Sequence, residues 1–319
     1  MLLIREEAVQ QILTMDMCIQ AVEECYRQLG EGKASNTPRQ NLWTTPPRSI
    51  KLAAGGLPEI GFMGVSAYSA GFGQKGSGAA STLLYDSNSG KLVAILESKF
   101  LGWYRTGGTS AVAAKYLAPT DSEALALIGT GRQARSQLLA LRKVLKKLKV
   151  VRAFSRSLEH RENYAREMGR ETGLDILPAE TAKDCVARAD VVITITTSRE
   201  PVLKKEWIKE GSLVSALGGH YPEASEVDVD TVLSSRVIVD SREQALIEKG
   251  EILVPIRKGL ATDEIIKAEL GEVVCGSKRA RITVGERVLF CSGGISAEQI
   301  AVAARIYLEA IRQGLGQEL

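Results

Sequence analysis

The sequence predicts an α/β protein with two domains, one built on a doubly wound parallel sheet and the other a mixed α+β fold. Three observations support this fold class. From about residue 122 onward, apolar runs alternate with helical stretches, as strands and crossover helices do in a parallel sheet. Before residue 119, alternating segments and a turn sequence predict an antiparallel sheet. The chain has 319 residues with 45% apolar content, enough to bury two ordinary cores.

The first third of the chain combines a helix with strand-like segments. Residues from about Thr14 to Gly30 carry apolar side chains at helical spacing, with Thr14 or Asp16 as the N-cap and Gly30 at the end. The segment GFMGVSAYSAGFG alternates, and in ASTLLYDSNSGKLVAIL the turn NSG separates two apolar runs, which predicts a hairpin. A last helix is expected from about Ser296 to Gln313. We therefore place one domain at residues 1–118 with about 296–319, and the other at 119–295.

The second domain begins with a glycine-rich loop. An apolar run, ALALI, leads into Gly129-Thr130-Gly131-Arg132-Gln133-Ala134 and then into a helical stretch. Strand, glycine loop and helix in this order are the fingerprint of a Rossmann domain that binds a dinucleotide. Gly129 permits the tight turn, Gly131 lets the backbone approach the pyrophosphate, and Ala134 allows close helix packing. The helix N-terminus offers N–H groups and a positive dipole to the phosphates.

The second strand, VVRAFS, predicts which dinucleotide is bound. An NAD-dependent enzyme normally carries an acidic residue where this strand ends, but here Ser155-Arg156-Ser157 follows it. A guanidinium between two hydroxyls suits a 2′-phosphate, so NADP(H) is favoured and NAD(H) is the alternative. Arg156 as an ordinary residue at a helix start is the other interpretation. We expect the nicotinamide near the ends of two later strands, at Thr196-Thr197-Ser198 and Ala216-Leu217-Gly218-Gly219.

Composition excludes several other classes of function. The net charge is +3, and the basic run from Arg142 to Lys149 is too short for a nucleic-acid surface. No stretch of 18 apolar residues occurs, and charges interrupt the first apolar residues, so we expect a cytoplasmic protein without a membrane partner. The five cysteines lack a CxxC pair, which predicts reduced thiols and no metal site. They are Cys18, Cys25, Cys185, Cys275 and Cys291.

Several motifs, in this order along the chain, resemble the ornithine cyclodeaminase/μ-crystallin family. They are Thr37-Pro38-Arg39, Leu57-Pro58-Glu59, Met63-Gly64-Val65, Leu84-Tyr85-Asp86 with Gly90, Tyr104-Arg105-Thr106, Ile128 to Ala134, Leu217 to Pro222, and Gly271 to Val274. The resemblance covers nearly the whole chain. It implies a homodimer whose first domain and last helix form the subunit interface and the substrate pocket, with a Rossmann domain inserted between them. It also implies chemistry on small amino, imino or keto substrates.

The same resemblance assigns two arginines to the substrate. Arg39 and Arg105 match family arginines that clamp the substrate carboxylate, and a guanidinium binds a carboxylate through two parallel hydrogen bonds. A surface role is the alternative for both. Thr106, Ser292 and Gly293 complete the set of residues that we expect to contact the cofactor.

Two positions depart from the family pattern. Family members usually read Gly-Val-Lys where this chain has Ser66, which removes one charge from the pocket and predicts weaker binding of α-carboxylates. Two interpretations apply to Lys51 and Lys75: one of them supplies the missing charge, or each is an ordinary solvated lysine. His220 stands where cyclodeaminases carry an aspartate, so ornithine cyclisation is disfavoured. With a usual pKa near 6.5, His220 suits proton transfer, although it is equally suited to bind the cofactor or backbone. We expect the other histidine, His160, to face solvent.

The leading hypothesis is an NADPH-dependent oxidoreductase that transfers hydride to or from a C=N or C–N bond. Imine reduction, reductive amination and the reverse dehydrogenation of an amine or amino acid all fit it. In this hypothesis Arg39 and Arg105 orient the substrate, Ser66 shapes the pocket, and His220 or water handles protons. Two alternatives remain: an ammonia lyase of the ornithine cyclodeaminase type, and a non-catalytic NADPH-dependent binding protein of the μ-crystallin kind.

Overall fold

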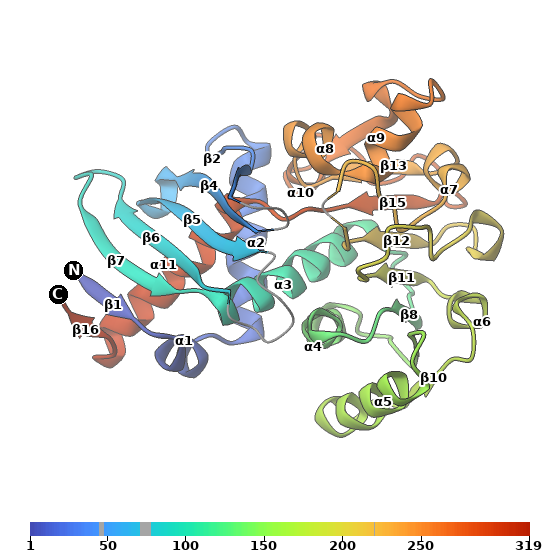
Figure 1. The fold of residues 1–319 in the computed structure, drawn as a ribbon, viewed down its shortest axis with the longest axis horizontal. Coiled ribbons are helices and arrows are strands. Elements are labelled where there is room, and N and C mark those ends of the chain that lie inside the picture. Colours follow the sequence, from blue (N-terminus) through green and yellow to red (C-terminus); the bar gives the residue numbers. More distant parts are fainter. Residues whose placement is uncertain (45–47, 71–77, 220) are drawn as a thin grey trace. The chain divides into compact units, whose positions relative to one another are not determined.

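The computed structural model describes residues 1–44, 48–70, 78–219 and 221–319. These residues form two compact units, which we call unit 1 (Met1–Thr109 with Gly294–Leu319) and unit 2 (Ser110–Gly293). Each unit contains an eight-stranded sheet, antiparallel for the most part in unit 1 and parallel in unit 2 (Figure 1). The predicted α/β fold class is therefore confirmed. Helix α3 (Lys99–Leu117) contributes residues to both units.

The sheet of unit 1 has the strand order β16-β1-β7-β6-β5-β4-β2, and β3 also pairs with β4. Only the pairing of β1 with β7 is parallel among its described strands. The predicted NSG turn joins β6 and β7 in antiparallel pairing, so the hairpin is confirmed. The strands are β1 (Leu2–Ile4), β2 (Ser35–Asn36), β3 (Gln40–Trp43), β4 (Ser49–Leu57), β5 (Phe62–Ala70), β6 (Ala80–Asp86), β7 (Leu92–Glu97) and β16 (Gln317–Glu318).

Helix α11 (Ser296–Gln313) packs across one face of this sheet, because two glycines leave room for it. A Cβ built on Gly55 would lie 2.6 Å from the Cα of Ala297, and one on Gly64 would lie 2.7 Å from a methyl of Ile300. Helix α2 (Met15–Gly30) packs against α11. It begins as predicted, since Thr14 Oγ1 accepts from Met17 N at 3.2 Å. The remaining helices of unit 1 are α1 (Glu6–Ile12) and the 3₁₀ turn η1 (Pro58–Ile60).

Unit 2 is an all-parallel sheet of order β10-β9-β8-β11-β12-β15-β13-β14. The chain moves outward from β8 through β9 to β10, then returns to the other side of β8 at β11. Ligands bind at such a reversal, beyond the carboxyl ends of the strands. The strands are β8 (Ala124–Ile128), β9 (Val150–Phe154), β10 (Ile176–Pro178), β11 (Val191–Thr194), β12 (Leu213–Ala216), β13 (Arg236–Val239), β14 (Ile266–Glu269) and β15 (Val288–Cys291).

The central strands of unit 2, β8, β11, β12, β15 and β13, are buried on both faces, as their continuous apolar runs predict. One face packs with the shorter helices into a core that includes Val192, Val214, Val237 and Leu289. The helices are α4 (Arg132–Val144), α5 (Leu158–Thr172), α6 (Ala182–Val186), α7 (Val229–Leu233), α8 (Arg242–Glu248), α9 (Gly250–Arg257) and α10 (Leu270–Val274), with the 3₁₀ turns η2 (Lys205–Trp207) and η3 (Asp263–Ile265). None of the helices in the described part of the chain combines the length and apolar character needed to cross a bilayer.

Candidate functional site

The glycine loop of unit 2 connects β8 to α4 at the reversal of the sheet. Gly129 has φ +108°, and a Cβ there would lie 2.5 Å from the carbonyl oxygen of Ile195, so only glycine fits. Gly131 is different: its φ is −77°, and a Cβ would meet nothing within 4 Å. Ala134 is buried against the sheet, and its carbonyl accepts from Tyr164. The loop therefore has a tight turn, an open position and a close helix contact in the order that the motif requires.

The N-terminus of α4 receives no side-chain cap within the described residues, and Gly131 occupies the N-cap position. Four other helices of unit 2 are capped, by Ser157, Thr181, Asp228 and Ser241. The first turn of α4 thus carries the positive end of a 13-residue helix dipole that no described side chain caps. An anion such as a pyrophosphate fits this arrangement.

The end of β9 carries the residues predicted to select the dinucleotide. Ser157 caps α5 by accepting from the N–H of His160, and Ser155 Oγ donates to the carbonyl of Ser157. Arg156, between them, is exposed and forms no hydrogen bond or ion pair with the described residues. His160 is exposed as predicted. The strand end therefore presents a guanidinium that is not paired with any described residue, and it carries no carboxylate.

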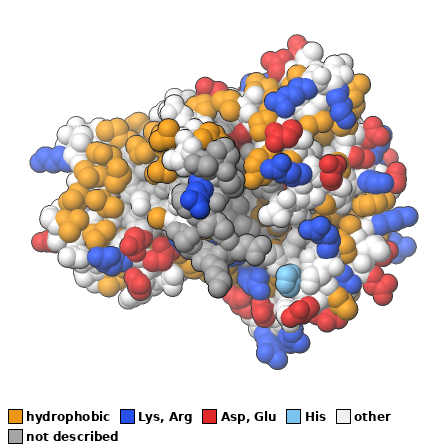
Figure 2. All heavy atoms as spheres, in the orientation of Figure 1, with side chains coloured by type: hydrophobic (Ala, Val, Ile, Leu, Met, Phe, Trp, Pro, Cys, Tyr) orange, Lys and Arg blue, Asp and Glu red, His pale blue; other side chains and the backbone are white. Residues whose placement is uncertain are grey.

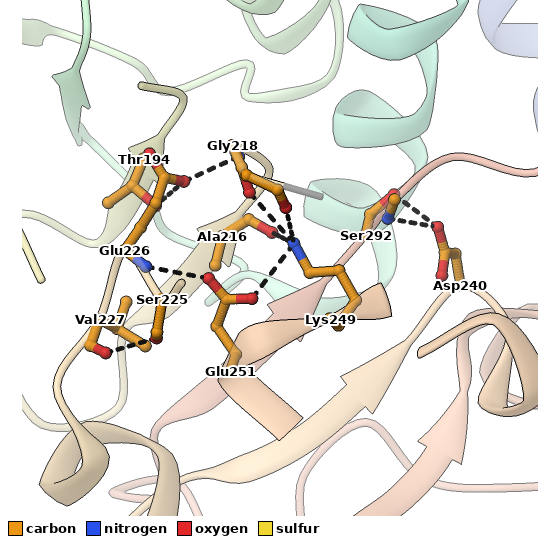
Figure 3. Close-up of polar contacts among 12 residues, drawn as sticks. Thr194, Ala216, Gly218, Ser225, Glu226, Val227, Asp240, Lys249, Glu251 and Ser292 are labelled. Atoms are coloured by element: carbon orange, nitrogen blue, oxygen red, sulfur yellow. Dashed lines mark hydrogen bonds and ion pairs between the residues drawn. The ribbon is translucent and has the colours of Figure 1, made fainter. Parts of the chain in front are cut away.

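The loops that follow β11 and β12 are joined by one buried carboxylate (Figure 3). Glu226 Oε1 accepts from the backbone N–H and the hydroxyl of Thr196, both at 2.6 Å. Its Oε2 accepts from Thr194 Oγ1 at 2.8 Å and from Gly218 N at 2.7 Å. Burial raises the pKa of Glu226, and the bonds from Thr196 and Thr194 oppose that shift. A Cβ on Gly218 would collide with Glu226 and the Thr196 carbonyl, so this position requires glycine.

A buried ion pair lies beneath the β12 loop. Lys249, between α8 and α9, has no exposed surface, and its Nζ lies 3.2 Å from Glu251 Oε2. Glu251 Oε1 accepts from the backbone N–H of Glu226 at 3.0 Å, which links the pair to the loops above. Burial lowers the pKa of Lys249, but Glu251 outweighs it with help from Cys291 and Glu226, so the net pKa is raised and the ammonium stays charged.

The other predicted cofactor residues differ in how their polar groups are used. Ser292 Oγ and Gly293 N both donate to Asp240 Oδ2 at 2.8 Å, at the end of β15. Ser198 Oγ donates to the Glu200 carbonyl, whereas Thr197 is exposed. Four further predicted residues fall into two groups: Arg132 is exposed and Gln133 half-buried at the start of α4, and Thr130 and Leu217 are buried at strand ends.

In unit 1 the two predicted arginines meet at one glycine. Arg39 Nη2 donates to the carbonyl of Gly294 at 2.7 Å, and its guanidinium lies 5.9 Å from the centre of the Tyr68 ring. A Cβ on Gly294, whose φ is +73°, would collide with the guanidinium of Arg105. Arg105 lies inside α3, as does Thr106, whose hydroxyl donates to the Gly102 carbonyl.

A fully buried carboxylate that the sequence analysis missed holds Arg105. Glu298, in the first turn of α11, accepts from Arg105 Nη1 at 2.9 Å and from the hydroxyl of buried Tyr26. Arg105 Nη2 has no hydrogen-bond partner among the described residues. Both guanidinium groups therefore lie at Gly294, and the buried carboxylate of Glu298 accepts from one of them.

Ser66 contacts the first residue of α11, which follows Gly294 by two positions. Its Oγ is 2.9 Å from the Oγ of Ser296, which donates to the carbonyl of Ala53 at 2.9 Å. Strand register pairs Ser66 with Ala53 and Tyr68 with Lys51, so these side chains share the face on which α11 packs. Lys51 is half-buried there. Two predicted residues, His220 and Lys75, lie outside the described residues.

Fold and loops together define a two-domain protein of the Rossmann dinucleotide-binding class. The chain belongs to the ornithine cyclodeaminase/mu-crystallin family, because the model of that family matches residues 1–314. Its relatives include the alanine dehydrogenase of Archaeoglobus fulgidus, which is 32% identical over 100% of this chain and 98% of the relative.

Two solved structures are also similar to this chain. The Thermococcus litoralis Δ(1)-pyrroline-2-carboxylate reductase, in complex with NADH and L-proline, is 33% identical with a TM-score of 0.95 and complete coverage of both chains. An archaeal alanine dehydrogenase dimer with bound NAD is 30% identical with a TM-score of 0.94, covering 100% of this chain and 98% of that one. The predicted family is therefore confirmed.

Proposed function

We propose that this protein is an oxidoreductase that uses a nicotinamide dinucleotide to transfer hydride to or from the carbon of a C=N or C–N bond in a small substrate. The observation that carries the proposal is the loop from Gly129 to Ala134, which has an open position at Gly131 and leads into an uncapped helix. Relatives named as alanine dehydrogenase and pyrroline-2-carboxylate reductase support the C–N chemistry.

Two features of the loop fit a dinucleotide: the open position at Gly131 and the uncapped N-terminus of α4. The pyrophosphate would lie against the Gly131 backbone and the first turn of α4, and the adenosine ribose would lie beside Ser155 and Arg156. When bound, the nicotinamide supplies or accepts the hydride. The residues of unit 2 bind and orient that group, and the loops after β11 and β12 are the part of the site assigned to its nicotinamide half.

The preferred form of the cofactor is NADP(H), because Arg156 is uncommitted and the end of β9 lacks a carboxylate. Arg156→Ala is expected to raise the Kd of NADPH about tenfold or more, the worth of a charge-assisted bond, and to leave NADH binding unchanged. Arg166→Ala removes another exposed arginine of unit 2, on helix α5, and serves as the control. Equal weakening of both dinucleotides by Arg156→Ala contradicts the preference.

At the substrate, Arg39 and Arg105 would hold an anionic group, since both guanidinium groups lie at Gly294 and a guanidinium binds a carboxylate through two parallel hydrogen bonds. An iminium needs hydride at carbon only, so the protein contributes mainly position and exclusion of water. Ser66 offers a hydroxyl where the family pattern has lysine. The site should therefore depend less on a carboxylate in the substrate, which favours substrates that lack one. Proton transfer to the nitrogen is assigned to His220 or to water.

The test is NADPH oxidation, followed by absorbance, with three substrate sets: cyclic imino acids, keto acids with amines, and carboxylate-free ketones with amines. Turnover of the third set, with Ser66→Lys shifting preference toward the acids by about tenfold, supports the proposal. Asn88→Lys adds the same charge to an exposed hairpin turn and is the control. Tight NADPH binding without turnover points instead to the non-catalytic binding protein, and ammonia release from ornithine without net NADPH change points to the cyclodeaminase.

A homodimer is part of the proposal. On the sheet face opposite α11, apolar side chains are exposed, with Leu42 61%, Ile50 44% and Met63 40% accessible. Figure 2 shows hydrophobic side chains gathered over β5 to β7 on this unit. Such a face marks a protein interface, and one related structure is a dimer. Met63→Asp should convert the dimer to a monomer in light scattering, unlike Leu233→Asp at an exposed position of α7. A monomeric wild type contradicts this assignment.

A further inference from the structure

The ammonium of Lys249 contacts carbonyl oxygens of the loop that follows β12 (Figure 3). Its Nζ lies 3.4 Å from the carbonyl oxygen of Ala216, 3.2 Å from that of Gly218 and 3.4 Å from that of Gly219. An ammonium has three N–H donors and no acceptor, so the side chain faces the carbonyl oxygens of Ala216, Gly218 and Gly219 and one carboxylate. A lysine without exposed surface at this place is costly unless it is fully paired.

The contacts of Lys249 with these carbonyl oxygens fix the orientation of one peptide group. The peptide between Gly218 and Gly219 is planar and trans, so its N–H points away from the direction of its C=O. Because the Gly218 carbonyl faces Lys249, the N–H of Gly219 faces away from the ammonium. The preceding N–H groups are occupied: Leu217 donates to the Thr194 carbonyl at 2.9 Å, and Gly218 donates to Glu226.

The N–H of Gly219 is different, because it makes no hydrogen bond with any residue that the structure describes. Gly219 is partly exposed and has φ +62°, and a Cβ built on it meets no described atom within 4 Å. A donor that is held in one direction and that no described residue uses is suited to a ligand acceptor, because the orientation costs nothing further at binding.

The strand order indicates which part of a dinucleotide this donor would meet. Along the edge of the sheet the order is β9, β8, β11, β12. The adenosine end is assigned to β9 and the pyrophosphate to β8, so the opposite half of the ligand lies toward β11 and β12.

We propose that Lys249 is a positioning residue, which orients the Gly219 N–H as a hydrogen-bond donor to the nicotinamide half of the bound dinucleotide. The proposal rests on the proposed function. Glu226 holds the N–H side of Gly218 while Lys249 holds its carbonyl side, and Glu251 anchors both. Glu251 Oε2 accepts no hydrogen bond from the described residues and has the ammonium as its counter-charge. The lysine therefore also balances the buried charge of Glu251, and the experiment must separate this structural role from the orientation of Gly219.

The experiment compares Lys249→Met with the double variant Lys249→Met/Glu251→Gln, which removes the unpaired buried charge as well. We measure the Kd of NADPH and of adenosine 2′,5′-bisphosphate, which lacks the nicotinamide half, by calorimetry. Both variants should bind NADPH about five- to tenfold more weakly, the worth of one hydrogen bond, and bind the bisphosphate as the wild type does. Lys205→Met changes an exposed lysine of the same unit and should alter neither Kd.

Hydrogen exchange gives a second readout, since peptides spanning residues 213–219 should exchange faster in both variants. A double variant that binds NADPH like the wild type shows that the lysine only balances Glu251, and this overturns the proposal. Parallel weakening of both ligands also overturns it, because it indicates a general loss of structure. A wild type that binds neither ligand refutes the proposed function itself, which is a different result from either of these.

Discussion

Replacing Glu298 by glutamine tests whether the buried carboxylate holds unit 1 together. The carboxylate accepts from Arg105 at one oxygen and from Tyr26 at the other, whereas glutamine offers a single acceptor oxygen and turns an NH₂ toward the second donor. The side chains of Glu298 and Tyr26 have no exposed surface, and Arg105 is 16% exposed, so water replaces little of the loss. Losing a buried charge-assisted bond and leaving a donor unpaired costs about 3 kcal/mol.

Urea denaturation followed by tryptophan fluorescence measures this cost, because two of the three tryptophans, Trp43 and Trp103, lie in unit 1. With a slope of about 2–3 kcal/mol per molar urea, the midpoint should fall by about 1 M. Glu309→Gln makes the same change on the same helix, but its partner Arg312 has a side chain that is 73% exposed, so water replaces more of the lost interaction and the midpoint should fall by much less than in Glu298→Gln. If the midpoints of the two variants coincide, the buried ion pair does not stabilise this unit.

Three further predictions concern unit 2 and the thiols. Gly131→Ala should leave the thermal midpoint unchanged but weaken NADPH binding at least about tenfold. Gly129→Ala should instead destabilise the protein by about 2 kcal/mol or more, because the φ of Gly129 is +108° and the Ile195 carbonyl blocks the Cβ. The reverse pattern in thermal shift and calorimetry refutes the assignment. Burial raises the pKa of Asp190, but the hydrogen bonds from Lys209 and from two backbone N–H groups outweigh it and lower the pKa below 3.8. Its contribution to stability is therefore present above pH 3.8 and lost as pH falls through the lowered pKa, so the fall in urea midpoint caused by Asp190→Asn should be largest at pH 6 and should shrink as pH falls below 3.8; an effect that stays constant over this range contradicts this. A thiol reagent should modify one cysteine per native chain and five after unfolding, since Cys275 alone is partly exposed and burial raises the pKa of the other four thiols; rapid modification of two or more native thiols disproves the described burial.

Short-range signals in the sequence predicted much of the fold. The Thr14 cap, the NSG hairpin and the last helix follow from neighbouring residues, and α11 begins and ends at the predicted positions. The start of α3 was missed because Gly102, Gly107 and Gly108 weaken the helical signal. The structure explains one of them: a Cβ on Gly108 would lie 3.1 Å from the sulfur of Cys18, so the glycine permits close packing.

The candidate site divides in the same way. Glycine loops and strand ends are read from adjacent residues, so the Gly129 to Ala134 loop was recognisable. Lys249, Glu226 and Glu298 were missed, because each acts through partners that are distant in sequence: Glu298 meets Arg105 across 193 residues. In the sequence, Lys249 and Glu251 flank a glycine and resemble a solvated helix boundary. Their burial follows from Gly250, whose Cβ would collide with the Ala224 carbonyl.

The division of unit 1 into two chain segments sets an order of events during synthesis. Unit 2 is one continuous stretch, Ser110–Gly293, and it leaves the ribosome before the residues from Gly294 onward. Until α11 is made, the sheet face at Gly55 and Gly64 lacks the helix that covers it. The inserted domain can therefore fold first, while the segment that precedes it waits for its last helix, and chaperones have their longest opportunity to bind at that apolar face.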